Sequence, residues 1–178
     1  MSDFSVEYGK ALYLLAKEDE LTTSMLEEIE AVDSVLKENK EYISLMDTPA
    51  LSLNERAGLI DDAFSTCSLY VKNFLKLLSE KKCFYCFSDC VKEYKKIYDE
   101  ENNIERVEAI SSIPLNEGQL LRLKEKIEKT VNKTVVIVNK VDESILGGVI
   151  LRFNDKQYDG SVKSRLDDLS AKIKGSIF

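Results

Sequence analysis

The sequence predicts a mainly α-helical protein, in which an N-terminal six-helix bundle is followed by a small α/β domain with the order β-α-β-β-α. Apolar residues recur at helical spacing as far as Glu101, and short β-branched segments follow them. Glycine and proline, the residues that interrupt helices, number only 7 and 2 in a chain of 178 residues. We therefore expect two domains, formed by residues 1–105 and 106–178.

The N-terminal domain is expected from six stretches in which apolar side chains repeat every three or four positions. In the first stretch, Phe4, Tyr8 and Leu15 fall on one face of a helix. The later stretches have the same spacing and are separated by short polar segments, as in helical bundles. The expected helices span Phe4–Leu15, Met25–Leu36, Glu41–Met46, Leu53–Phe64, Tyr70–Leu78 and Cys83–Glu101.

Two of these helices have a sequence signal for their first turn. Ser24 with Glu27, and Ser52 with Glu55, have the spacing of a capping box. In this motif the hydroxyl and the carboxylate each accept a hydrogen bond from a backbone N–H that has no partner within the helix. Both pairs are therefore expected to mark helix starts.

The C-terminal domain is expected from a change of pattern after the sixth helix. β-Branched residues become dense in segments too short for helices, which indicates strands. Pro114 ends the first strand, Asn116 with Gln119 can cap the next helix, and Asn154-Asp155 has the chemistry of a tight turn. The expected strands span Val107–Ile110, Val135–Val141, Gly148–Phe153 and Lys156–Tyr158, and the expected helices carry apolar stripes over Leu120–Val131 and Val162–Ile173.

Charge is divided unevenly between the two domains. Residues 1–105 carry 22 acidic and 12 basic side chains, whereas residues 106–178 carry 10 acidic and 13 basic ones. A chain with a net charge of −7 is not drawn as a whole to phosphate backbones or anionic lipid. The weakly basic C-terminal domain lacks the loop of KH domains and the aromatic strands of RRMs, so we expect no nucleic-acid partner. The asymmetry indicates a different partner for each domain.

The absence of histidine excludes several kinds of chemistry. Ser-His-Asp and Cys-His catalysis require imidazole, as do many metal sites. Gly147-Gly148 matches neither a P-loop nor a dinucleotide-binding turn, because the other glycines and the lysine of those motifs are missing. We therefore expect a protein that is not an enzyme and that holds no cofactor.

Four cysteines could hold a metal or form a disulfide, and the second possibility depends on where in the cell the protein is located. No apolar run approaches the roughly 18 residues of a membrane span, and the first residues do not resemble a signal peptide. We therefore expect a cytosolic bacterial protein with reduced thiols. Cys83, Cys86 and Cys90, with Cys67, could hold a metal, but three of them fall at i, i+3 and i+7 of one helical pattern. Because a free cysteine packs as a small apolar residue, we expect core thiols.

Two helices carry more apolar residues than one core-facing side needs. These are the helices expected over Phe4–Leu15 and Tyr70–Leu78. One interpretation is that all of their apolar side chains belong to the core. The other is that some of them line a groove for an amphipathic partner helix, which would make the protein a small helical adaptor. The residues alone leave both interpretations open.

A long motif near the C-terminus resembles a known family. Residues 141–152 read VDESILGGVILR and residues 159–166 read DGSVKSRL. These segments resemble the C-terminal block of the delta subunit of bacterial F-type ATP synthases, a relative of the mitochondrial oligomycin-sensitivity-conferring protein. Residues 8–12 and 73–78 resemble its first and fifth helices, so the resemblance covers essentially the whole chain. Gly9 stands where that family usually has alanine, and we expect it to loosen the first helix by about 1 kcal/mol.

The resemblance implies a function as well as a fold. It implies a non-catalytic subunit of the peripheral stalk, or stator, which keeps the catalytic alpha–beta head from turning with the rotor. The N-terminal domain would bind N-terminal helices of the alpha subunits, and the C-terminal domain would hold the C-terminal ends of the b subunits. The protein, a monomer in isolation, would be present once per complex, on the cytoplasmic face of the bacterial cell membrane, which it would reach only through the complex.

The resemblance also implies the residues of two sites. In the C-terminal block the glycines would shape turns, and we expect Arg165 to pair with Asp159. The alpha-binding groove would be formed by Tyr8, Ala11, Leu12, Leu15, Phe74, Leu77 and Leu78. The family motif, serving fold and stalk attachment, would comprise Gly147, Gly148, Asp159, Gly160, Ser161, Arg165 and Leu166.

Overall fold

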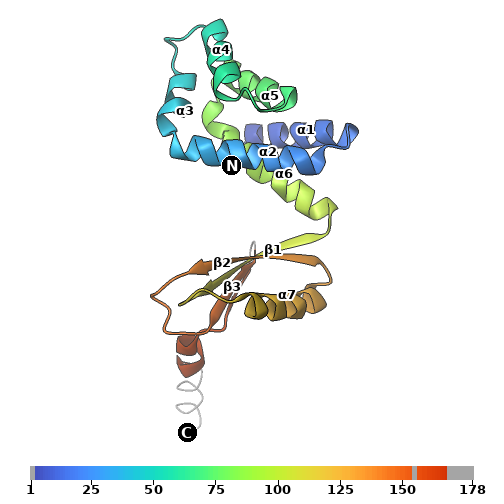
Figure 1. Cartoon of the computed structure of the whole chain (residues 1–178), viewed down its shortest axis with the longest axis vertical. Coiled ribbons are helices and arrows are strands. Elements are labelled where there is room, and N and C mark those ends of the chain that lie inside the picture. Colours follow the sequence, from blue (N-terminus) through green and yellow to red (C-terminus); the bar gives the residue numbers. More distant parts are fainter. Residues whose placement is uncertain (1–2, 154–155, 168–178) are drawn as a thin grey trace. The chain divides into compact units, whose positions relative to one another are not determined.

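The computed structural model describes residues 3–153 and 156–167 and divides into two compact units, Met1–Tyr98 and Asp99–Phe178. The chain is mainly helical, with a small four-stranded sheet in its C-terminal part (Figure 1). The sequence predicts this division between residues 105 and 106, a little later in the chain than the structure places it. Arg106 Nε donates to Asp99 Oδ2 at 2.7 Å, which ties the end of the last helix before the sheet to the first strand.

The first unit consists of helices joined by short connections, in agreement with the predicted apolar spacing. α6 continues past Tyr98 into the second unit, and a 3₁₀ turn, η1, precedes it. The elements are α1 (Asp3–Glu18), α2 (Thr22–Glu38), α3 (Lys40–Asp47), α4 (Leu53–Ala63), α5 (Leu69–Glu80), η1 (Phe84–Cys86) and α6 (Phe87–Glu101).

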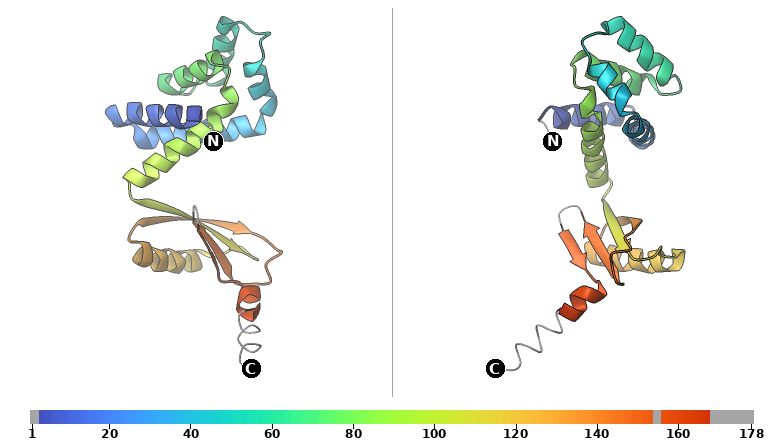
Figure 2. Two further views of the ribbon diagram at one scale, coloured as in Figure 1. Left: turned by 180° about the vertical axis from the view of Figure 1, so that it is seen from behind. Right: turned by 90° about the vertical axis from the view of Figure 1, so that its left-hand side faces the viewer.

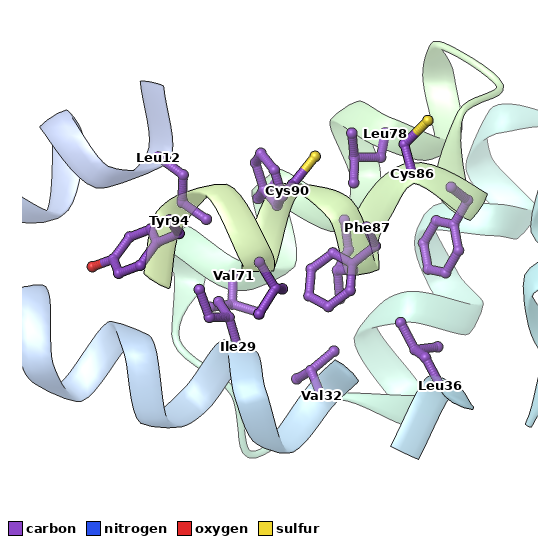
Figure 3. Packing of buried hydrophobic residues seen from close by; sticks show 14 of the residues in the cluster. Leu12, Ile29, Val32, Leu36, Val71, Leu78, Cys86, Phe87, Cys90 and Tyr94 are labelled. Carbon is purple, nitrogen blue, oxygen red and sulfur yellow. The ribbon is translucent and has the colours of Figure 1, made fainter. Parts of the chain in front are cut away.

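One apolar core holds these helices together. Figure 3 shows side chains of α2, such as Ile29 and Val32, beside Phe87 and Cys90 of α6. Complete burial of an aliphatic or aromatic side chain contributes roughly 1.5–3 kcal/mol, so this cluster supplies most of the driving force for folding. Core residues of this unit with 0% exposure are Ile29, Met46, Ile60, Val71, Leu75, Leu78, Phe84, Cys90 and Tyr94.

Two capping boxes are predicted for helix starts in this unit, and the structure has one of them. At the start of α4, Glu55 N donates to Ser52 Oγ at 3.3 Å and Ser52 N donates to Glu55 Oε2 at 2.8 Å, so the predicted capping box is confirmed. The box predicted for Ser24 and Glu27 is wrong, because α2 already begins at Thr22 and the Ser24 hydroxyl donates to the Leu21 carbonyl oxygen at 3.1 Å.

The sixth helix begins later than its apolar pattern predicts. Instead of starting at Cys83, α6 starts at Phe87, after the 3₁₀ turn. The two carboxylate oxygens of Asp47, at the end of α3, accept hydrogen bonds from Phe84 N at 2.9 Å and from Tyr85 N at 3.1 Å. These bonds satisfy the N–H groups of the turn from outside the helix, which favours the tighter turn at this point.

Gly9 has a different role from the one predicted. It is buried in α1, and a Cβ atom at this position would lie 2.7 Å from the carbonyl oxygen of Cys90 and 2.9 Å from Cβ of Glu93. The expected loosening of the helix is therefore not the main effect of this glycine. Its missing side chain allows the backbones of α1 and α6 to approach closely.

The second unit is built on a mixed sheet with the strand order β2-β1-β3-β4, so the predicted element order β-α-β-β-α has one strand too few. β1 and β2 are parallel and are connected through α7, whereas β3 is antiparallel to both β1 and β4 (Figure 2). A parallel pair needs such a crossover helix, while an antiparallel pair needs only a turn. The elements are β1 (Ile104–Ser111), α7 (Glu117–Val131), β2 (Thr134–Val141), β3 (Val149–Phe153) and β4 (Lys156–Asp159).

The core of the second unit is small. Ile127 of α7 packs against Val107 of β1 and Val135 of β2. The capping box predicted at the start of α7 is confirmed, since Gln119 N donates to Asn116 Oδ1 at 2.8 Å and Asn116 N donates to Gln119 Oε1 at 2.9 Å. Residues 162–167 are helical, as predicted for the last helix. The later members of its apolar stripe, Leu169 and Ile173, lie outside the described residues.

Candidate helix-binding groove

A groove of about 520 Å³ lies between α1 and α5 of the first unit. Leu12 and Phe74, which are 4% and 7% exposed, form its floor, whereas Leu15 and Leu77, which are 40% and 38% exposed, present apolar surface to solvent. A long apolar concavity between two helices is the form that accepts an amphipathic helix. The lining residues are Glu7, Tyr8, Ala11, Leu12, Leu15, Tyr70, Asn73, Phe74 and Leu77.

The structure brings together most of the predicted groove residues, although they come from two helices far apart in the sequence. On α1 they repeat at i, i+3, i+4 and i+7, so they share one face. That these residues bind a partner stays a prediction. The predicted residues found in the groove are Tyr8, Ala11, Leu12, Leu15, Phe74 and Leu77.

Leu78 does not belong to the groove. It is 0% exposed and lies in the core with Val71 and Leu75, which share its face of α5 (Figure 3). Successive residues of a helix point about 100° apart, so the adjacent Leu77 faces the groove while Leu78 faces inward.

Three lining residues were not predicted from the sequence. Glu7, Tyr70 and Asn73 lie within one turn of predicted residues on the same helix faces. The apolar pattern passes over Glu7 and Asn73 because they are polar, and it assigns Tyr70 to the core. Extending the lining faces by one turn, regardless of polarity, would have found all three.

A hydrogen bond joins the ends of the two helices that line the groove. The Tyr70 hydroxyl, at the start of α5, donates to Asp19 Oδ2 at 2.5 Å, directly after the end of α1. This hydrogen bond, together with the negative charge of Asp19, raises the pKa of Tyr70. The contact joins the end of α1 to the start of α5 beside the groove.

Charge is sparse in the groove. Glu7 is the one lining residue with a carboxylate, and no lining residue is basic. At its other end, the rings of Phe4 and Tyr8 stack with 4.0 Å between their centroids, which adds flat apolar surface. The groove therefore presents a mainly apolar surface with one negative charge, at Glu7.

The cysteines lie in the core of the same unit. Cys83, Cys86 and Cys90 are 7%, 4% and 0% exposed, which confirms the prediction that they pack as apolar side chains. Burial raises the pKa of the Cys83 thiol to about 11 and that of the Cys90 thiol to about 12. Within residues 3–153 and 156–167 no three His, Cys, Asp or Glu side chains are arranged to hold a metal ion.

The family motif of the second unit forms a tight junction between two turns. Gly148 has φ +88°, and a Cβ atom there would lie 2.5 Å from the carbonyl oxygen of Gly160. Gly147 is held by Val162 N, which donates to its carbonyl oxygen at 3.0 Å. The predicted role of these glycines in shaping turns agrees with this geometry, because a side chain at position 148 would separate the two segments.

The polar members of the motif cap the following helix. Asp159 Oδ1 accepts from Ser161 N at 2.8 Å, and Ser161 Oγ accepts from Ser164 N at 3.2 Å. Hydrogen bonds from the side chain and the backbone of Ser161 lower the pKa of Asp159. The predicted pairing of Arg165 with Asp159 is wrong: no ion pair joins them in the described part of the chain, and Asp159 uses its carboxylate for the turn. Leu166 is 54% exposed.

These features define a class of protein by its fold: a helical unit with an open apolar groove, joined to a small α/β unit. The family profile described as "ATP synthase delta (OSCP) subunit" matches residues 5–173. The chain belongs to this family, and it is a component of the peripheral stalk of the F-type ATP synthase. In the described ranges, no helix has the length and apolarity needed to cross a bilayer.

Individual relatives agree with this assignment. "ATP synthase subunit delta" of Clostridioides difficile is 36% identical over 168 residues, which cover 93% of each chain. Its namesake from Lactobacillus acidophilus is 33% identical over 172 residues, covering 96% of this chain and 94% of its own. A chain in the solved structure of the Toxoplasma gondii mitochondrial ATP synthase hexamer has the same fold, with a TM-score of 0.74 and 20% identity over 97% of this chain and 98% of its own.

Proposed function

We propose that the chain links the catalytic alpha–beta head of the ATP synthase to the membrane-anchored b subunits, and so holds the head against the torque of the rotor. The first unit acts as a six-helix bundle that binds the N-terminal helix of an alpha subunit. The second unit holds the C-terminal ends of the b subunits. One copy serves each complex, at the cytoplasmic face of the bacterial membrane. Membership of the ATP synthase delta family supports this proposal.

The observation that carries the alpha-binding part is the open groove between α1 and α5. A stator must stay attached under load, which requires slow dissociation. Buried apolar anchors in a well-shaped groove provide slow dissociation better than charges at an interface rim do. Leu15 and Leu77 offer apolar surface that a partner helix would bury, on either side of a groove floor whose own side chains are already buried.

The best test of this groove is a charge on its exposed wall. Leu15→Asp places a carboxylate against the partner helix without disturbing the core, because Leu15 is 40% exposed. We expect it to weaken binding of a peptide with the alpha-subunit N-terminal sequence by about 10- to 100-fold, since the carboxylate must give up its hydration wherever the peptide covers it. Isothermal titration calorimetry with the same organism's alpha sequence measures this change in affinity.

Leu14→Asp is the matched control. Leu14 is the neighbouring residue on α1, is 49% exposed, and does not line the groove. Its substitution should leave the affinity unchanged, and both variants should keep the circular dichroism of the parent. Equally weakened binding at positions 14 and 15, or unchanged binding at position 15, would contradict the groove assignment.

A further inference from the structure

The sheet of the second unit is wider than the helix that covers it. Four strands lie in the order β2-β1-β3-β4, and neighbouring strands are about 4.8 Å apart, whereas a helix with its side chains is only about 10 Å across. α7 packs over β1 and β2, where Ile127 meets Val107 and Val135. A helix of this width covers about two strands. Leu151 and Phe153 of β3 pack against this cluster but are only partly buried, and β4 is exposed along its whole length.

The strand register shows which side chains face this uncovered part. Phe153 lies opposite Val107, and Tyr158 lies opposite Leu151. Directly opposite residues of paired strands point to the same face, as do residues two apart along a strand, so all four share the face on which α7 lies. The rings of Phe153 and Tyr158 meet edge to face at 5.4 Å, and Tyr158 is still 59% exposed. An aromatic pair therefore stands open to solvent beside α7.

Together with α7 these strands form a second groove, of about 700 Å³. One wall consists of Leu123, Ile127 and Val131, which are four residues apart on α7 and hence on one face. The other wall consists of Leu151 and the aromatic pair just described. Both walls are apolar, and the space between them continues the layer in which α7 lies.

The rim of this groove is basic. Its charged lining residues are Lys126, Lys133 and Lys156 with a single acid, Glu105. Lys133 Nζ donates to Glu105 Oε2 at 2.9 Å, and that pairing raises the pKa of Lys133. Lys126 and Lys156 form no ion pair with any residue that the structure describes. Two positive charges therefore remain to attract acidic groups on a partner.

The opposite face of the sheet carries charged side chains among its apolar ones. There Glu108 of β1 forms ion pairs with Lys140 of β2 and Arg152 of β3, so polar side chains satisfy one another across the strands. The apolar groove itself lies on the α7 face.

We propose that one α-helix of a partner lies in this second groove, beside α7 and over β3 and β4, and that it carries acidic side chains next to its apolar stripe. The helix completes the layer that α7 begins, and its acids meet Lys126 and Lys156. The inference rests on the proposed attachment of the second unit to the b subunits, and it names the surface used. The sign of the charge is opposite to that of the first groove, where Glu7 is the lining charge, so each groove disfavours the partner of the other.

The test uses the full-length chain and the soluble part of the b subunits of the same ATP synthase. The double variant Lys126→Glu, Lys156→Glu reverses both unpaired charges at exposed positions. We expect it to bind b about tenfold or more weakly at low ionic strength, with a smaller difference as salt is added. Tyr158→Ala removes an exposed aromatic side chain and should weaken binding by about tenfold at either ionic strength.

The control is the double variant Lys129→Glu, Lys163→Glu, which makes the same change of net charge on exposed side chains outside the groove. It should bind b as the parent does. If b binds the parent but both groove variants keep the parent's affinity, the groove assignment is overturned while attachment to b stands. If the parent itself does not bind b, the proposed attachment fails and the groove proposal fails with it. A loss of self-association, with b affinity unchanged, would make a second copy the occupant and also overturn the assignment.

Discussion

A single missing side chain sets the approach of α1 to α6. Because a Cβ atom at Gly9 would overlap the backbone of Cys90, we expect Gly9→Ala to destabilise the first unit by about 1–2 kcal/mol. Overpacking costs roughly 1–3 kcal/mol, which outweighs the gain of about 1 kcal/mol in helix propensity. Urea unfolding followed by circular dichroism measures the difference.

Gly58 is the matched control for this substitution. It lies inside α4, and a Cβ atom there would meet nothing within 4 Å. Gly58→Ala should therefore stabilise the protein by about 0.5–1 kcal/mol, through helix propensity alone. Stabilisation by both substitutions would contradict the close approach at Gly9. The two glycines look alike in the sequence, and only the packing of the helices separates them.

At the scale of the elements, apolar spacing predicted where the helices lie better than it predicted their ends or their faces. The start of α6 is decided by the carboxylate of Asp47, which lies 37 residues before Phe84, so no local pattern reveals it. Leu77 and Leu78 are adjacent and identical in chemistry, so the sequence could not say which faces the groove. The groove itself was foreseen as one of two interpretations, because a surplus of apolar residues shows on the helices. Choosing between the two required the tertiary structure.

The end of α1 permits a prediction for an element boundary. Leu21 N donates to Ala16 O at 2.8 Å and Glu20 N donates to Lys17 O at 3.2 Å, the two hydrogen bonds of a Schellman motif. Glu20 has φ 58°, a left-handed conformation that strains any residue with a side chain. Glu20→Gly should therefore raise the free energy of unfolding by about 0.5–1 kcal/mol.

Thermal and urea unfolding of Glu20→Gly measure this gain. Glu18→Gly, in the last turn of α1, is the comparison, because glycine there only weakens the helix and should lower stability by about 0.5–1 kcal/mol. Destabilisation by both substitutions would mean that the left-handed residue at position 20 is not under strain.

At the scale of the whole molecule, the two units carry grooves of different chemistry. The resemblance of the C-terminal motif predicted the division of labour, but the second groove has no signal in the sequence. Its walls come from Leu123, Ile127 and Val131 on α7 and from strands that lie beside each other only in the folded sheet. Each of these residues, taken alone, looks like part of an ordinary core stripe.

Removing the second unit should separate the two attachments. A chain ending at Glu101, the last residue of α6, keeps every helix that packs around the first core and both walls of the first groove. We expect it to bind the alpha-subunit peptide within about twofold of the full chain, because none of the groove's lining residues is removed. It should not bind the soluble part of the b subunits, which calorimetry on the same preparation measures. Retained b binding would place the stalk contact on the helical unit, and a stator built that way would carry torque through one unit instead of two.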